Sequence, residues 1–70
     1  MLYVLKIKGT TTIPDFVQIR DKNLTLIAYF RLSQAGKGLK KNKLEKYSND
    51  ILELLEKIPF GKIYKYKNNG

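Results

Sequence analysis

The chain of 70 residues contains no histidine and no cysteine. Without histidine, no side chain has an unperturbed pKa near neutrality, and the commonest general acid–base group is missing. Without cysteine there is no thiolate nucleophile, no disulfide and no soft metal ligand. The only serines, Ser33 and Ser48, have no base to activate them. The composition therefore predicts a protein that is not an enzyme and that needs no cofactor and no metal.

Long hydrophobic runs are also missing. No stretch approaches the roughly 20 apolar residues that span a bilayer, and residues 1–6 lack the basic start and the long apolar run of a signal peptide. We therefore expect a cytoplasmic protein that binds no membrane. With 43% hydrophobic residues, we expect one small domain over 1–70 with a single core, in which 68–70 form a frayed tail.

Positive charge is the feature that the chain has in excess. Lys and Arg number 14 against six Asp and Glu, which gives a formal net charge of +8. Such a charge favours acidic macromolecules such as RNA or DNA over a small-molecule substrate. Only Arg20 and Arg31 are arginines, however, and arginine is the better residue for bidentate recognition of phosphates and bases. The net positive charge indicates that a partner would be negatively charged, but it does not identify the partner.

The hydrophobic pattern predicts four strands and one helix. Strands are expected over 2–8, 16–20, 24–32 and 62–67, a flexible segment over 33–38, and a helix over 42–58. Asn42 and Glu45 would cap this helix, and Pro59 must end it. The order β-β-β-α-β predicts an α+β fold, a three- to four-stranded, mainly antiparallel sheet with one helix packed on one face. A helix that crosses the sheet once would place the last strand beside the first and parallel to it, in the order 4-1-2-3.

One face of the predicted sheet is a candidate binding surface. Alternation directs Tyr3, Leu5, Ile7, Val17, Ile19, Leu26, Ala28 and Phe30 toward the helix. The opposite face would carry Lys6, Lys8, Gln18, Arg20, Tyr29 and Arg31, joined by either Lys65 and Lys67 or Lys62, Tyr64 and Tyr66. Cations between aromatic rings suit single-stranded nucleic acid, whose bases stack on the rings while its phosphates meet the cations. The alternative is a merely solvated face, as antiparallel sheets usually have.

A second candidate is the segment 36–43, in which Lys37, Lys40, Lys41 and Lys43 stand at the expected entrance of the helix. Two glycines, the free amides of a first helical turn and clustered ammonium groups would attract a phosphate backbone. The segment lacks the Gly-x-x-x-x-Gly-Lys-Ser/Thr pattern of a nucleotide-binding loop. The alternative is a mobile loop whose charges serve solubility.

Apolar residues on the outer face suggest a third reading. Leu2, Val4, Phe16, Ile27 and Tyr29 fall on the face assigned to solvent, and a monomer seldom leaves such a patch open. A symmetric dimer through this face or through an edge strand would cover it. Alternatively, some of these residues turn inward at strand ends. Because Ile27 and Tyr29 alternate with a fully apolar set, we predict that they contact a partner, either protein or nucleic acid.

Together these features predict a non-catalytic binding module that contacts RNA or DNA through a basic and aromatic surface. The residues expected to bind are Lys6, Lys8, Arg20, Tyr29, Arg31, Lys37, Lys40, Lys41, Lys43, Tyr64 and Tyr66. The alternative function is a small protein–protein interaction module or accessory subunit. It would self-associate through the apolar sheet face, with Ile27 and Tyr29 in the interface, or through an edge strand.

Overall fold

A four-stranded antiparallel sheet forms one layer of the structure, a computed structural model that describes residues 1–67. Its strands are β1 (Leu2–Ile7), β2 (Phe16–Arg20), β3 (Leu26–Arg31) and β4 (Ile63–Tyr66). The second layer holds two helices, α1 (Ala35–Lys41) and α2 (Ser48–Lys57), and a 3₁₀ turn precedes each of them, at Leu32–Gln34 and Glu45–Tyr47. The predicted α+β class is confirmed. The predicted frayed tail, 68–70, lies outside the described residues.

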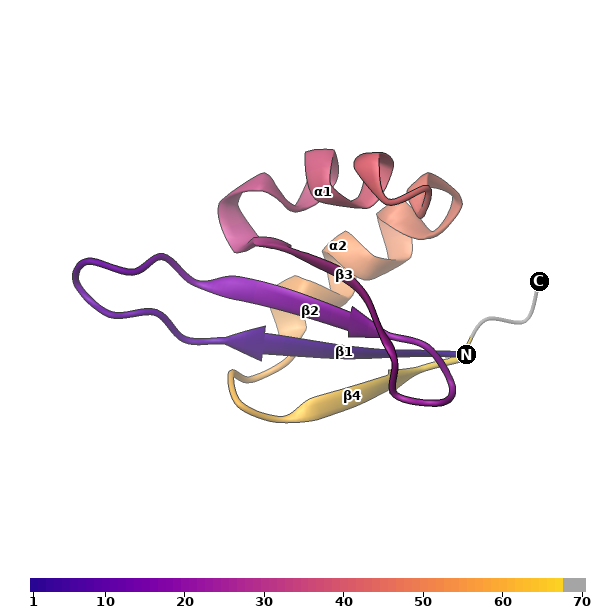
Figure 1. Ribbon diagram of the computed structural model, residues 1–70, viewed down its shortest axis with the longest axis horizontal. Coiled ribbons are helices and arrows are strands. Elements are labelled where there is room, and N and C mark those ends of the chain that lie inside the picture. The colour runs from indigo at the N-terminus through magenta and orange to yellow at the C-terminus, as the bar shows by residue number, and fades with distance from the viewer. Residues whose placement is uncertain (68–70) are drawn as a thin grey trace.

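The strands lie in the order β3-β2-β1-β4, which is the predicted order. The predicted direction of the last strand is wrong, because β4 pairs antiparallel with β1, from Leu2 opposite Tyr66 to Leu5 opposite Ile63. Figure 1 shows the cause: the chain crosses the sheet in α1 and returns in α2 before it enters β4. Two crossings bring the chain back to the end at which β3 finishes, so β4 runs against both β3 and β1.

The helical region consists of two helices where the sequence pattern predicts one. Residues 33–38, predicted to be flexible, are largely helical, since three of the seven residues of α1 are buried in the core. The helix α1 ends at Asn42, whose side-chain amide donates to the Gly38 carbonyl at 2.7 Å. Lys43 then adopts a left-handed φ of 61°. Asn42 therefore closes α1 and does not form the predicted capping pair with Glu45 at the start of α2.

The core lies between the sheet and the helices, and four of the eight sheet residues predicted to face the helix occupy it. β2 and β3 direct Val17, Ile19, Ala28 and Phe30 inward as predicted. In the helical region Leu44, Ile51, Leu55 and Ile58 are buried, and Tyr47 packs against them. Leu26 is an exception and stays exposed, because the register between β2 and β3 shifts at Ile19 and Arg20.

The side chains of β1 point in the opposite sense to the prediction. Leu2, Val4 and Lys6 are buried under the helices, whereas the intervening residues are half-buried and face away from them. Residues 2–5 are apolar on both faces of the strand, so alternation alone does not decide their orientation. The orientation that buries Lys6 is stable because its ammonium group reaches carbonyl oxygens at the end of α2.

The turns follow the predicted breaks. The carboxylate of Asp21 accepts hydrogen bonds from the backbone amides of Asn23 and Thr25, at 2.8 and 3.0 Å, and so closes the turn between β2 and β3. The residue with a left-handed backbone conformation in this turn is Leu24, with a φ of 64°. Pro59 follows α2 as predicted.

Candidate functional site

The sheet has one face with no other layer over it among residues 1–67. Both helices lie on one side of the sheet (Figure 1), and the strand pairs fix which side chains point to the other side. We call this other side the open face. The pairs place Tyr3, Leu5, Ile7, Phe16, Gln18, Arg20, Leu26, Tyr29, Arg31, Ile63 and Lys65 on it, and Ile27 joins them by alternation with the buried Ala28 beside the register shift. Among the described residues the face thus combines eight apolar or aromatic side chains with three cations, Gln18 and no carboxylate.

The open face is more apolar than predicted, because β1 contributes different residues. Tyr3, Leu5 and Ile7 replace the predicted Lys6 and Lys8, and Leu2 and Val4 turn inward. Ile27 and Tyr29 are 38% and 53% exposed, so they lie at the surface. Phe16, Ile27 and Tyr29 thus keep the predicted orientation.

Two rings on the open face form a stacked pair. The ring centroids of Phe16 and Tyr29 lie 4.8 Å apart, with an angle of 21° between the ring planes. The two residues come from neighbouring strands and are diagonal neighbours on the same face. Phe16 pairs with Arg31, which is two residues after Tyr29, and Tyr29 pairs with Gln18. Stacking holds both rings in a defined orientation on the open face, next to the edge strand β3.

A hollow of about 420 Å³ lies between this ring pair and α1. We call it the edge hollow, since β3 is an edge strand of the sheet. Its wall contains the two rings, three cations and two neutral polar side chains, over a base of Phe30 and Gly38. The lining residues are Phe16, Tyr29, Phe30, Arg31, Gln34, Lys37, Gly38, Lys41 and Asn42. No acidic residue of the described part of the chain, 1–67, lines the hollow, so its field attracts anions.

The edge hollow brings together residues from both predicted binding sets. Tyr29 and Arg31 come from the sheet set, and Lys37 and Lys41 come from the lysine-rich segment. Lys37 and Lys41 share one side of α1 because they are four residues apart. Lys40 and Lys43 are exposed but do not line the hollow. The prediction that these lysines surround the first turn of a helix is wrong, since Lys40 and Lys41 form the last turn of α1.

Arg20 lies on the open face as predicted, and the fold holds its side chain in place. One guanidinium nitrogen donates to the Leu24 carbonyl at 2.9 Å, and the other donates to the side-chain oxygen of Gln18 at 3.0 Å. Arginine has no acceptor, so the atom of Gln18 that faces it must be the oxygen. The amide nitrogen of Gln18 is thereby directed away from Arg20.

Lys6 does not belong to a binding surface, which corrects the prediction. It is only 7% exposed, and its Nζ donates to the carbonyls of Leu55 and Ile58 at 2.7 and 2.9 Å. The ammonium group also lies 4.4 Å from the centre of the Phe60 ring. Lys8 is exposed but lies two residues after Lys6, so it points to the same side of the sheet. Its Nζ lies 5.0 Å from the centre of the Phe60 ring, so Lys8 too is absent from the open face.

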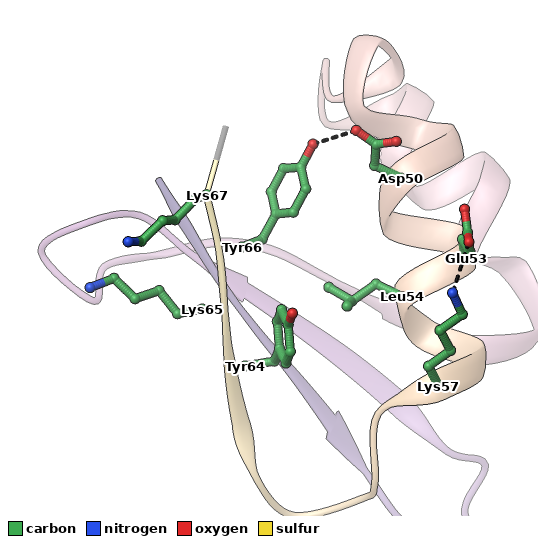
Figure 2. Close-up of a pocket in the computed structure, with 8 residues that line it drawn as sticks. All are labelled: Asp50, Glu53, Leu54, Lys57, Tyr64, Lys65, Tyr66 and Lys67. Atoms are coloured by element: carbon green, nitrogen blue, oxygen red, sulfur yellow. Dashed lines mark hydrogen bonds and ion pairs between the residues drawn. The ribbon is translucent and has the colours of Figure 1, made fainter. Parts of the chain in front are cut away.

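Of the two alternatives predicted for the last strand, the structure places Lys65 on the open face. Tyr64 and Tyr66 point toward the helices, so neither shares a face with Tyr29 (Figure 2). Figure 2 shows both rings beside α2, with Lys65 and Lys67 directed the other way. The Tyr66 hydroxyl donates to an Asp50 oxygen at 2.7 Å, and this hydrogen bond raises the pKa of Tyr66 above its usual value.

The hollow in Figure 2, about 480 Å³ in volume, has a mixed lining of acids and lysines. Asp50 and Glu53 stand in it, and Lys57 binds Glu53 at 2.9 Å, which raises the pKa of Lys57. Carboxylates repel phosphate, so this hollow suits a polyanion less well than the edge hollow does.

Two aromatic residues of the open face were not among the residues predicted to bind. Phe16 faces outward as expected, but its stacking on Tyr29 depends on the pairing of β2 with β3. Tyr3 lies on the open face because the side chains of β1 point to the opposite faces from those predicted. Alternation could identify Phe16 as a candidate, whereas no signal in the sequence separates Tyr3 from Leu2 and Val4.

Comparisons add no relative from which a role could be read: no family model, no curated protein and no solved structure matches the chain. Within residues 1–67, no helix has the length and apolar character needed to cross a membrane. The same residues contain no group of three or more acidic side chains placed to hold a metal ion.

Proposed function

We propose that the protein is a non-catalytic binding module for RNA or DNA, and that the edge hollow is the centre of its contact surface. Arg31, Lys37 and Lys41 would bind phosphates, while Phe16 and Tyr29 would stack against a base. The observation that carries the proposal is the composition of the hollow: three cations from two elements surround a stacked ring pair without a carboxylate. Every nucleotide of a nucleic acid carries a phosphate, which can bind the cations, and a base whose aromatic face can stack on the rings.

The proposal predicts binding that depends strongly on salt. Each phosphate contact releases condensed counterions, so affinity for a single strand falls with salt with a slope of about −0.7 per contact. Fluorescence anisotropy of a labelled mixed-sequence oligonucleotide at two salt concentrations measures this slope. Binding at the lower concentration that weakens steeply at the higher one supports the proposal, and absence of binding at the lower concentration contradicts it.

A second function, protein–protein interaction, is favoured by the apolar half of the open face. Leu5, Ile7 and Ile63 lie there together, and Ile63 is 56% exposed. Two arguments weigh against a symmetric dimer through this face. Four strands of four to six residues present a flat area of roughly 350 Å², whereas each partner in a stable dimer buries about 800 Å². The three cations of the face would also repel their copies.

The double variant Ile27→Thr, Tyr29→Thr tests whether the open face binds any partner. Both side chains are exposed, so we expect the free energy of unfolding to stay within about 1 kcal/mol of wild type. Association, whether with an oligonucleotide or between copies, should be lost. Urea unfolding measures the first effect, and anisotropy with analytical ultracentrifugation measures the second. A variant that unfolds would show that these residues belong to the core.

A further inference from the structure

The occupant of the open face can be argued from its charge and its rings. Its cations are Arg20, Arg31 and Lys65, and no acidic side chain projects from the strands on this side. A partner that covers the apolar centre must therefore be anionic at its rim. Three aromatic residues stand on the three neighbouring strands β1, β2 and β3. Bases of nucleic acid, linked by phosphates, fit both features.

Only a single strand can place its bases on this surface. In a duplex the bases are paired and stacked inside, and only their edges reach the grooves. A flat sheet can contact the phosphates of a duplex but cannot stack on its bases. The apolar area between the rings, including Leu5 and Ile7, would then stay uncovered. Single strands with splayed bases cover such an area.

Gln18 stands at the centre of this surface, and a hydrogen bond within the protein fixes the orientation of its side-chain amide. It lies between Leu5 and Tyr29 across the sheet, and between Phe16 and Arg20 along its own strand. Its oxygen accepts the guanidinium hydrogen bond of Arg20 at 3.0 Å. Within residues 1–67 no acceptor is paired with its amide nitrogen. The pair of Gln18 and Arg20 thus presents N–H donors to the open face.

A donor-only centre distinguishes among bases. Thymine and uracil carry two ring carbonyls, which accept from such donors. Adenine accepts only at ring nitrogens, and N1 and N7 lie beside its N6 amino group, a donor that needs an acceptor of its own. The bidentate contact by which glutamine recognises adenine needs its side-chain oxygen as well as its nitrogen, and here Arg20 engages that oxygen. We propose that the open face binds single-stranded nucleic acid and that Gln18 is a specificity-determining residue that favours carbonyl-bearing bases over adenine. This inference rests on the proposed function.

The test compares two proteins on three ligands at low salt. The proteins are wild type and Gln18→Met, which keeps the length of the side chain but removes its donors. The ligands are labelled oligothymidine and oligoadenosine of about twelve nucleotides, and a duplex of the same length. Because self-stacking of oligoadenosine affects both proteins equally, the effect of the variant on each strand is the informative quantity. Thermal unfolding followed by circular dichroism checks that the variant is folded.

We expect Gln18→Met to weaken oligothymidine binding by roughly three- to tenfold, the value of one hydrogen bond, and to weaken oligoadenosine binding by a smaller factor. Wild type should also prefer oligothymidine to the duplex. Equal losses on both strands, or equal affinity for the duplex, would overturn the inference but leave the proposed function standing. Failure of wild type to bind any of the three ligands would overturn both, as would a dimer that buries the open face.

Discussion

At the scale of single residues, Lys6 shows how a charged side chain can belong to the core. Its ammonium group donates to the Leu55 and Ile58 carbonyls, which lie at the C-terminal end of α2. Carbonyls at a helix end lack partners within the helix and carry the negative end of its dipole. Lys6 satisfies two such carbonyls, and the Phe60 ring covers the same ammonium group. The residue therefore stabilises the contact between β1 and α2.

Replacement of Lys6 tests this assignment. In Lys6→Met the side chain keeps its apolar length, but two carbonyls lose their donor, so we expect the free energy of unfolding to fall by about 1–3 kcal/mol. The matched control Lys8→Met removes the same charge from an exposed position on the same strand end and should change stability by less than about 0.5 kcal/mol. Urea unfolding measures both. Equal stability of the two variants would show that the buried hydrogen bonds of Lys6 do not matter.

Tyr66 provides a pH-dependent test at the same scale. Its hydrogen bond to Asp50 favours the neutral phenol, so its pKa in the folded protein lies above the usual value of about 10. The stabilisation is fully present below that usual value and is lost as the pH rises through the raised pKa. In an absorbance titration of the tyrosines, Tyr66→Phe should remove a component at high pH. Asp50→Asn should move that component to lower pH, and an unchanged titration in both variants would contradict the hydrogen bond.

The residues also show where the sequence is informative. In β3, apolar Ala28 and Phe30 alternate with Tyr29 and Arg31, so the sequence predicts the buried face correctly. In β1 both faces are apolar, and the orientation follows from a bond between Lys6 and carbonyls about 50 residues away. A contact over such a distance leaves no local pattern in the sequence. The predicted binding set therefore includes Lys6 wrongly and omits Tyr3.

At the scale of elements, the position of α1 depends on a close approach to β3. Gly38 is buried against Phe30, and a Cβ on this glycine would overlap the Phe30 ring. Gly36 lies on the same helix, but a Cβ there would meet nothing within 4 Å. The two glycines thus differ in what an added methyl group would contact, although both lower helix propensity equally.

Alanine at each glycine separates packing from propensity. We expect Gly36→Ala to stabilise the protein by up to about 1 kcal/mol, because alanine favours a helix. Gly38→Ala should instead destabilise it by about 1–3 kcal/mol, because the methyl group must displace α1 or the Phe30 ring. It should also weaken oligonucleotide binding, since Lys37 and Lys41 would move with α1. Thermal unfolding of both variants measures the difference, and a stabilised Gly38→Ala would contradict the packing of α1 on β3.

The elements themselves were partly predictable. The positions of the strands, the breaks between them and the sheet order are predicted correctly, although β3 and β4 are shorter than the predicted 24–32 and 62–67. The division of the helical region is not predicted, because the segment around Gly36 and Gly38 has the composition of a loop. It becomes helical through packing, which outweighs the low helix propensity of glycine. One missed helix was enough to reverse the predicted direction of β4.

At the scale of the whole molecule, charge is divided between surfaces. Three of the six acids, Asp50, Glu53 and Glu56, lie on α2, and Glu53 binds Lys57 there. Among the described residues, all charged side chains of the open face and the edge hollow are cationic. The net charge of +8 is therefore less important than its distribution. A polyanion on these two surfaces meets five cations: Arg31, Lys37 and Lys41 at the edge hollow, Arg20 on β2, and Lys65 on β4 at the opposite edge of the sheet.

The most direct test of the account removes charge from this surface and, in a control, from elsewhere. The triple variant Arg31→Ala, Lys37→Ala, Lys41→Ala and the control Lys22→Ala, Lys46→Ala, Lys62→Ala lose the same number of positive charges from exposed positions. The quantity to measure is the slope of the logarithm of affinity for a mixed-sequence single strand against the logarithm of salt concentration. We expect the first variant to reduce the steepness of this slope by about 2 and the control to leave it near the wild-type value. Equal slopes in the two variants would show that net charge alone attracts the strand and that the edge hollow is not its binding site.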